Sequence, residues 1–144
     1  MDGDKWHIIH LYFKYGFIDK TGKVVIPSTY DEVRNFSEGL CEVMEDKKWG
    51  FIDKTGKVVV PLIYDEVGHF REGLCWVRKD KKWGFVDKTG KVVVPLVYDY
   101  VRSFSEGLCG VNIGGQIGSY DVVEGGKWGF VNKKGVSLYP PPDF

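Results

Sequence analysis

Residues 48–61 read KWGFIDKTGKVVVP, and this stretch carries most of the information about the fold. Residues 48–53 alternate aromatic and non-aromatic side chains, which is typical of a short β-strand. The DKTG sequence at 53–56 has the chemistry of a tight turn, because Asp accepts hydrogen bonds there and Gly tolerates a left-handed backbone. The β-branched run at 57–60 predicts a second strand, and Pro61 ends its ladder. The stretch therefore predicts an antiparallel β-hairpin.

The same hairpin recurs along the chain with a period of 34 residues. The string GFIDKTGKVV begins at Gly16 and again at Gly50, and Gly84 begins the same string with Val in place of Ile. A gap-free alignment of 16–49 with 50–83 gives 25 identities in 34 positions. A fixed period of this length indicates a tandem array in which neighbouring units complete each other's core.

The period divides the chain into a capping strand, repeat units and a tail. The capping strand is 1–15, the units are 16–49, 50–83, 84–128 and the partial unit 129–140, and the tail is 141–144. The step from Trp83 to Trp128 is 45 residues, so the third unit carries 11 additional residues. They fall in the Gly-rich segment 112–126.

Each unit ends in a third strand, at 74–78 in the second unit. The polar stretch 64–73 before it is interpreted as a turn or a single helical turn that buries Tyr64, Val67 and Phe70, spaced at three. Gly and Pro interrupt every window of about ten residues, so no longer helix is expected. The predicted fold is all-β: tandem antiparallel hairpin repeats of 34 residues, three short strands per unit, stacked as a solenoid-like or meander array.

Composition excludes several classes of function. The 144 residues contain 20 Lys+Arg and 20 Asp+Glu, giving a net charge of zero and a pI near 6.8. Neither a nucleic acid nor a membrane is therefore expected as a partner. No apolar run approaches a membrane-spanning length, and the acidic first residues do not resemble a signal peptide. Three widely spaced cysteines form no disulfide framework, so a cytoplasmic protein is expected.

The string KWGFIDKTGKVVVP, followed by Tyr-Asp-x-Val and Phe-x-Glu-Gly-Leu, resembles the WG repeat family of bacterial proteins. The resemblance covers 16–140 and implies a tandem β-repeat with a binding or scaffolding role, without general catalytic residues. The chain departs from the family at Tyr15, where later copies have Trp, and after each Gly-Leu, where it has Cys41, Cys75 and Cys109.

The recurring acidic and sulfur-bearing residues are assigned to the frame. Asp53 and its equivalents occupy turns, and the fourth copy has Asn132, which keeps the turn hydrogen bond but cannot act as a base. Asp65 and its equivalents are expected to cap backbone N–H groups. The cysteines, one per unit, are expected as small buried side chains and not as metal ligands. No hydrolase, dinucleotide or phosphate-binding motif occurs, so neither an enzyme nor a cofactor is expected.

Positions that differ between units are the candidates for partner binding, because packing fixes the invariant ones. Trp76 stands where the other units have Glu42 and Gly110, so we expect an exposed aromatic anchor. The alternative is that Trp76 covers the segment 112–126. The candidate set is Trp76, Arg78, His69 and Arg71 from the second unit, with Tyr120 and Asp121 from the insertion.

Both ends of the chain depart from the repeat pattern. Residues 6–13 are hydrophobic and predict a strand that caps the first repeat; the alternative is an edge through which two copies form a homodimer. The proline-rich stretch 139–143 resembles a polyproline II segment, and it is either a stiff end or a peptide ligand.

Two classes of function remain open. The favoured one is a non-enzymatic interaction or scaffold module that presents a repeat-built surface to a protein, peptide or glycan. The other is an enzyme or enzyme accessory with its chemistry in the 112–126 loop, where Tyr120, Asp121 and Glu124 form the one non-repeated cluster of ionisable groups. Nothing in the sequence identifies a ligand.

Overall fold

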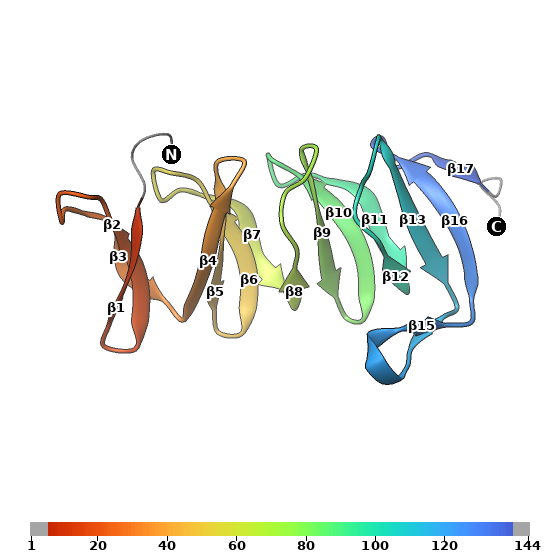
Figure 1. Ribbon diagram of the computed structural model, residues 1–144, viewed down its shortest axis with the longest axis horizontal. Coiled ribbons are helices and arrows are strands. Elements are labelled where there is room, and N and C mark those ends of the chain that lie inside the picture. Colours follow the sequence, from red (N-terminus) through yellow and green to blue (C-terminus); the bar gives the residue numbers. More distant parts are fainter. Residues whose placement is uncertain (1–5, 140–144) are drawn as a thin grey trace. The chain divides into compact units, whose positions relative to one another are not determined.

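The computed structural model describes residues 6–139, and these form antiparallel strands with one short 3-10 turn and no α-helix (Figure 1). The chain divides into two compact units, Met1–Asp65 and Glu66–Phe144, each of which is described by itself. Within 6–139, no helix is long and apolar enough to cross a membrane. The predicted tail at 141–144 and the first five residues of the capping segment lie outside the described residues.

The first unit contains two antiparallel sheets. The three-stranded sheet has the order β1-β2-β3 and consists of β1 (His7–Leu11), β2 (Lys14–Ile18) and β3 (Val24–Tyr30). The four-stranded sheet has the order β4-β5-β6-β7 and consists of β4 (Glu32–Ser37), β5 (Leu40–Glu45), β6 (Lys48–Ile52) and β7 (Val58–Tyr64).

The second unit contains two four-stranded sheets and the insertion. The first has the order β11-β10-β9-β8, with β8 (Glu66–Val67), β9 (Leu74–Lys79), β10 (Lys82–Asp87) and β11 (Val92–Tyr98). The second has the order β12-β13-β16-β17, with β12 (Tyr100–Val101), β13 (Leu108–Ile113), β16 (Lys127–Asn132) and β17 (Ser137–Tyr139). The insertion forms a two-stranded ribbon of β14 (Gln116–Ile117) and β15 (Val123–Glu124), joined by the 3-10 turn η1 (Ser119–Asp121).

The predicted all-β hairpin repeat is confirmed, with two differences. Pro61 does not end the second strand of its hairpin, because β7 continues through it to Tyr64, which pairs with Trp49. The other difference lies in the connection before the third strand. Tyr64, Val67 and Phe70 are buried, as expected. The chain between them is extended, however, and contains no helical turn: β8 pairs with β9 through Val67 and Val77. The pairing gives hydrogen-bond partners to backbone N–H and C=O groups that an isolated helical turn beside a buried strand would leave without partners. The four-stranded sheets therefore combine strands from adjacent sequence repeats.

The hairpin turn has the predicted chemistry. The Asp53 carboxylate accepts backbone N–H groups from Thr55 at 2.8 Å and Lys57 at 3.1 Å, and Gly56 has φ +88°. Hydrogen bonding to Thr55 lowers the pKa of Asp53. In the fourth hairpin, Asn132 accepts equivalent backbone bonds with its side-chain oxygen. These Asp residues stabilise turns.

In the first three repeats, the glycine that follows the repeat Trp or Tyr permits a close approach of two strands. The pairing of β10 with β11 shifts register between Trp83 and Phe85, where Gly84 lies, and again between Phe85 and Val86. A Cβ at Gly84 would lie 2.9 Å from the Leu96 nitrogen and closer still to the Val94 carbonyl oxygen. Gly16 and Gly50 face the same obstruction from their own partner strands. Only glycine fits this position without moving backbone.

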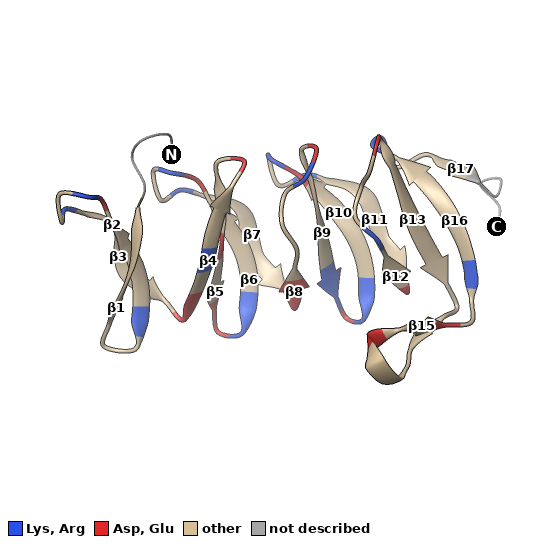
Figure 2. Ribbon diagram, in the orientation of Figure 1, with Lys and Arg blue, Asp and Glu red and all other residues tan. Residues whose placement is uncertain are grey.

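Charged residues fall mainly at the ends of the hairpins (Figure 2). The Lys82 ammonium pairs with Asp99 at 2.6 Å, and Asp99 also accepts the Gly114 N–H at 2.6 Å. Asp31 likewise accepts the Asp46 N–H at 2.9 Å. The predicted capping role is confirmed for Asp31 and Asp99, whose carboxyl pKa values are lowered mainly by their lysine partners.

One carboxylate joins three successive copies of the repeat. Glu72 accepts the backbone N–H groups of Glu106 and Gly107, both at 3.1 Å, and forms an ion pair with Lys133 at 3.1 Å. These contacts link turns of the second, third and fourth copies, and the ion pair lowers the pKa of Glu72. Contacts between neighbours of this kind stabilise a stacked array.

The three cysteines are free thiols buried in the core, as predicted. Cys109 donates its S–H to the Arg102 carbonyl oxygen at 2.9 Å. Burial raises the pKa values of Cys41 and Cys109 to about 12. Such thiols remain protonated at neutral pH and behave as small apolar groups.

The N-terminal strand β1 has the geometry of a third repeat strand, although its sequence departs from the pattern. It pairs His7 with Ile18, and the β5–β6 hairpin pairs the residues 34 positions later. The turn that follows has positive φ at Tyr12 and Phe13, which are 92% and 87% exposed. The equivalent turn residues at 46–47 are Asp and Lys. The turn at 12–13 therefore keeps the backbone geometry of the turn at 46–47 but carries two exposed aromatic residues in place of Asp and Lys.

Candidate functional site

Each repeat places an aromatic ring at the start of a central strand, and another side chain packs against that ring. The ring-to-ring or guanidinium-to-ring pairs are His10 on Tyr15 at 4.1 Å, Arg34 on Trp49 at 3.9 Å, Trp76 on Trp83 at 4.7 Å and Arg102 on Trp128 at 4.3 Å. The His10 ring is parallel to its partner ring, whereas the Trp76 ring is tilted by 43°. Stacking of a cation or a second ring on Trp is favourable. A covering side chain on this ring is therefore a recurring and favourable contact of the repeat.

In the second and third units, the covering side chain comes from one of two positions that face each other across a strand pair. The Gly68 N–H donates to the Trp76 carbonyl at 3.0 Å, and the Arg102 N–H donates to the Gly110 carbonyl at 2.9 Å. In each pair, one residue is Gly and the other supplies the cover. A Cβ at Gly68 would collide with the Trp76 indole. Differences at these positions between units therefore compensate one another.

The prediction of an exposed Trp76 was wrong. Its side chain is half-buried, because the indole lies over Gly68 and against Trp83. The residue at this position differs between repeats because Trp76 itself packs on Trp83, whereas in the third repeat Arg102 packs on Trp128 from the facing position. Variation between units is thus insufficient evidence of a free surface.

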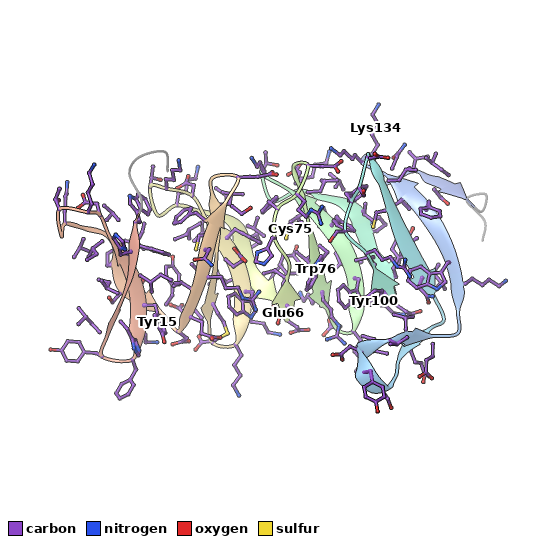
Figure 3. The ribbon with its side chains drawn as sticks, in the orientation of Figure 1. Tyr15, Glu66, Cys75, Trp76, Tyr100 and Lys134 are labelled. Atoms are coloured by element: carbon purple, nitrogen blue, oxygen red, sulfur yellow. The ribbon has the colours of Figure 1, made fainter. Side chains whose placement is uncertain are left out.

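The compact unit Glu66–Phe144 contains a row of four aromatic rings from successive repeats, and two of these rings, Trp76 and Tyr100, are labelled in Figure 3. Trp76 and Trp83 are 4.7 Å apart, Trp83 and Tyr100 are 5.0 Å apart, and Tyr100 and Trp128 are 6.3 Å apart at an interplanar angle of 79°. Tyr100 is specific to the third unit, because the equivalent residues are Glu32 and Glu66. The last two rings meet nearly at a right angle and form an aromatic corner.

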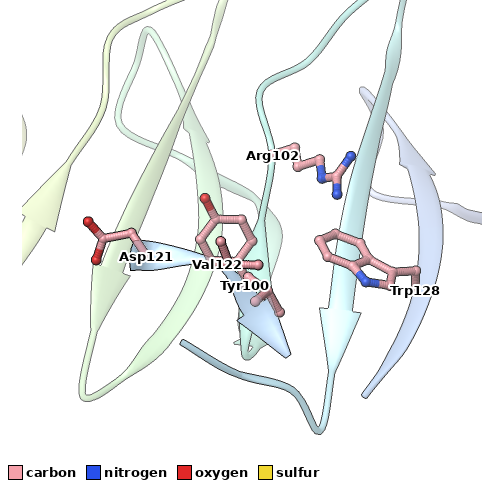
Figure 4. A pocket seen from close by; sticks show the side chains of 6 residues that line it. Tyr100, Arg102, Asp121, Val122 and Trp128 are labelled. Atoms are coloured by element: carbon pink, nitrogen blue, oxygen red, sulfur yellow. The ribbon is translucent and has the colours of Figure 1, made fainter. Parts of the chain in front are cut away.

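A pocket of about 430 Å³ lies where this corner meets the insertion (Figure 4). Its lining comes from the repeat frame and from the inserted segment: Tyr100, Arg102, Trp128, Asp121, Val122 and Val123. In Figure 4, the Arg102 guanidinium lies beside the Trp128 ring, and Asp121 lies on the other side of Tyr100. We call this the third-repeat pocket.

The pocket holds one unpaired cation and one unpaired anion. Within residues 6–139, the guanidinium of Arg102 and the carboxylate of Asp121 form no ion pair or hydrogen bond. Arg102 instead stacks on Trp128. Charges that line a pocket without internal partners are available to a ligand.

The insertion is held in place at its base. Asn112 is fully buried, donates its amide N–H to the Gly125 carbonyl at 3.2 Å, and accepts the Gly115 N–H at 2.8 Å. At the far end, Tyr120 and Asp121 have left-handed backbone angles, with φ of 63° and 57°. Non-glycine residues adopt this conformation at a cost that surrounding structure must offset. The buried amide thus anchors the ribbon that carries the pocket carboxylate.

The six candidate residues fall into three groups. Asp121 lines the pocket, whereas Trp76 and Arg78 lie beside Trp83, which contacts the pocket residue Tyr100. Tyr120 is 96% exposed and does not belong to the lining. His69 and Arg71 are exposed in the connection between β8 and β9, also outside the lining.

The sequence reasoning missed Tyr100, Arg102 and Trp128 as site residues. A signal for Tyr100 existed, because one aromatic residue replaces two glutamates in the motif Tyr-Asp-x-Val. Trp128 carried no such signal, since it is a repeat residue that becomes part of a pocket only through the insertion beside it.

These features define a tandem β-hairpin repeat protein with one pocket-forming insertion. The chain belongs to the family described as WG containing repeat, whose model matches residues 15–49, 49–83 and 83–116. The resemblance found in the sequence is thereby confirmed. Searches of curated proteins and of solved structures gave no match.

The fourth hairpin lies outside the matched residues but keeps the geometry of the repeat. Phe130 pairs with Tyr139, as Phe85 pairs with Val94 at positions 45 residues earlier. The repeat architecture therefore continues beyond the insertion.

Proposed function

We propose that the chain is a non-enzymatic interaction module that binds a protein, peptide or glycan ligand in the third-repeat pocket. One observation carries this proposal: the insertion and the unit-specific Tyr100 line the same pocket of about 430 Å³. This volume lies within the range of about 300–1,000 Å³ that is usual for ligand pockets.

The composition of the pocket supports a binding role. Aromatic and apolar side chains provide contact area, while one guanidinium and one carboxylate supply directional contacts. Trp, Tyr and Arg residues are enriched among the energetically dominant contacts in interfaces. The first two repeats form the same frame without the insertion and without an aromatic residue at the position of Tyr100. Ligand binding is therefore a reason for the presence of both features in the third repeat.

An enzyme with its chemistry in the loop 112–126 is the other class considered. General acid–base catalysis needs a titratable group positioned against a bound substrate. Tyr120 is 96% exposed, and Asp121 is exposed as well, so neither has the enclosed environment that tunes such a group. We therefore favour binding over catalysis.

The remaining partner assignments are part of the proposal. A net charge of zero argues against nucleic acid and against anionic membranes as ligands. Three free, buried thiols suit a reducing compartment, which supports a cytoplasmic location. A homodimer through β1 also remains a proposal, supported by the exposed Ile8 and Leu11 on that strand.

The test is a parallel screen of the intact chain on a peptide array and a glycan array. The Tyr100→Glu variant introduces the residue that the first two units carry at this position. Tyr12→Glu makes the same change at a tyrosine that is 92% exposed and outside the pocket. We expect a ligand whose affinity falls at least tenfold in Tyr100→Glu and is retained in Tyr12→Glu, with melting temperatures confirming that both variants fold. Absence of any ligand, or equal binding by both variants, would contradict the proposal.

A further inference from the structure

We infer that the ligand of the third-repeat pocket is a peptide segment with an acidic group for Arg102, a basic group for Asp121 and an apolar side chain between them. This inference rests on the proposed function and specifies its ligand. It follows from the two charged side chains that line the pocket and from the arrangement of its aromatic rings.

Arg102 is arranged to receive an acidic group. Its guanidinium carbon lies over the Trp128 ring, 4.3 Å from the ring centroid, and the guanidinium N–H groups have no hydrogen-bond or ion-pair partner among residues 6–139. A planar guanidinium held in this way suits a carboxylate, which it binds through two parallel hydrogen bonds. Among the described residues, no acidic side chain binds this guanidinium.

Asp121 provides the opposite charge within the same pocket. Its carboxylate is exposed, lines the pocket and has no ion-pair partner among residues 6–139. A lysine, an arginine or an amino terminus of a ligand would pair with it. Two opposite charges in one pocket favour a ligand that carries both, and this charge complementarity also orients the ligand.

The aromatic corner favours a peptide over a glycan. A sugar stacks on an open aromatic face, but the Arg102 guanidinium already lies over the Trp128 ring. Tyr100 meets Trp128 at 79°, and Val122 and Val123 complete the wall. A perpendicular corner with aliphatic neighbours suits a compact apolar side chain such as proline, leucine or valine. The pocket therefore matches an acidic, an apolar and a basic residue in one short segment.

The experiment selects ligands from a random peptide library displayed on phage, with the intact chain as bait. Enriched peptides are synthesised with a fluorescent label, and their affinities are measured by polarisation. We expect them to share an acidic and a basic residue that flank an apolar one. Arg102→Gln should weaken binding tenfold or more and Asp121→Asn about fivefold, whereas Arg71→Gln, at an exposed arginine outside the pocket, should change binding less than twofold.

A charge reversal separates direct contact from a general loss of structure. Arg102→Glu should abolish binding of the selected peptide, and replacing the acidic residue of that peptide by lysine should restore at least a tenth of the original affinity. Peptides without the shared charges, or peptides insensitive to Arg102→Gln, would overturn the inference. A glycan bound in a Tyr100-dependent manner would overturn the peptide inference but retain the binding function. If neither the peptide library nor the glycan array yields a ligand, both the peptide inference and the proposed binding function would be overturned.

Discussion

The substitution Gly84→Ala tests the structural reason for the glycine that names the repeat. An added Cβ would lie 2.9 Å from the Leu96 nitrogen and from the Pro95 carbonyl carbon, where ordinary contacts begin at 3.4 Å. The Val94 carbonyl oxygen lies closer still, and all three obstructing atoms are backbone, so β11 must move by more than about half an ångström. Overpacking of this kind costs about 1–3 kcal/mol. Because no side chain can rotate away, we expect about 3 kcal/mol.

Gly110→Ala is the matched control, because Gly110 is a buried strand glycine in the same unit. A Cβ there would lie 3.5 Å from Arg102 Cδ and 3.7 Å from Trp128, which are ordinary contacts. Replacing a strand glycine by alanine without strain stabilises by roughly 0.5–1 kcal/mol. The two variants should therefore differ by about 3–4 kcal/mol.

Urea unfolding followed by tryptophan fluorescence measures this difference. With a slope of about 1–3 kcal/mol per molar urea, the two midpoints should differ by at least about 1 M. Midpoints that agree within 0.3 M, which is about 0.3–0.9 kcal/mol at these slopes, would refute the reasoning, since they would show that β11 accommodates a Cβ at Gly84.

Three further predictions concern the turns and the core. Gly56→Val should destabilise by about 1–2 kcal/mol because φ is +88°, while Asp53→Asn should lower the melting temperature much less, as Asn132 already serves a turn; equal losses would contradict this. A thiol reagent at pH 8 should label native protein only as fast as it opens, because burial raises the pKa of Cys109 to about 12; stoichiometric labelling within seconds would be inconsistent with that burial. Asn-Gly at 12–13 should stabilise by roughly 1–2 kcal/mol, because both positions have positive φ; a lower melting temperature would exclude this turn geometry.

The hairpins were predictable because their chemistry is local. The turn at 53–56 depends on an Asp side chain, a Gly at positive φ and the residues between them, all within four positions. The same string recurs, so the repeat array also followed from the sequence. The pairing of β8 with β9 did not, because a two-residue strand has no periodicity to detect.

The pocket was only partly predictable, because its residues meet across strands. The insertion was identified by the break in period, and Asp121 was among the candidates. Arg102 faces Gly110 across a strand pair, as Gly68 faces Trp76, and a comparison of single positions does not reveal such facing pairs. Trp76 was misjudged for the same reason: its small partner Gly68 makes room for it.

Deleting residues 113–123 tests the central claim that the repeat frame is independent and the insertion builds the ligand site. The deletion restores the 34-residue step and leaves 125–126 as a Gly-Gly turn. Both glycines already have positive φ, 72° and 74°, as do the turn residues at 80–81. The measurement is polarisation binding of a peptide selected on the intact chain, with far-UV circular dichroism on the same sample. We predict an unchanged β spectrum and a loss of binding of at least a hundredfold; full affinity in the folded variant, or an unfolded variant, would contradict the account.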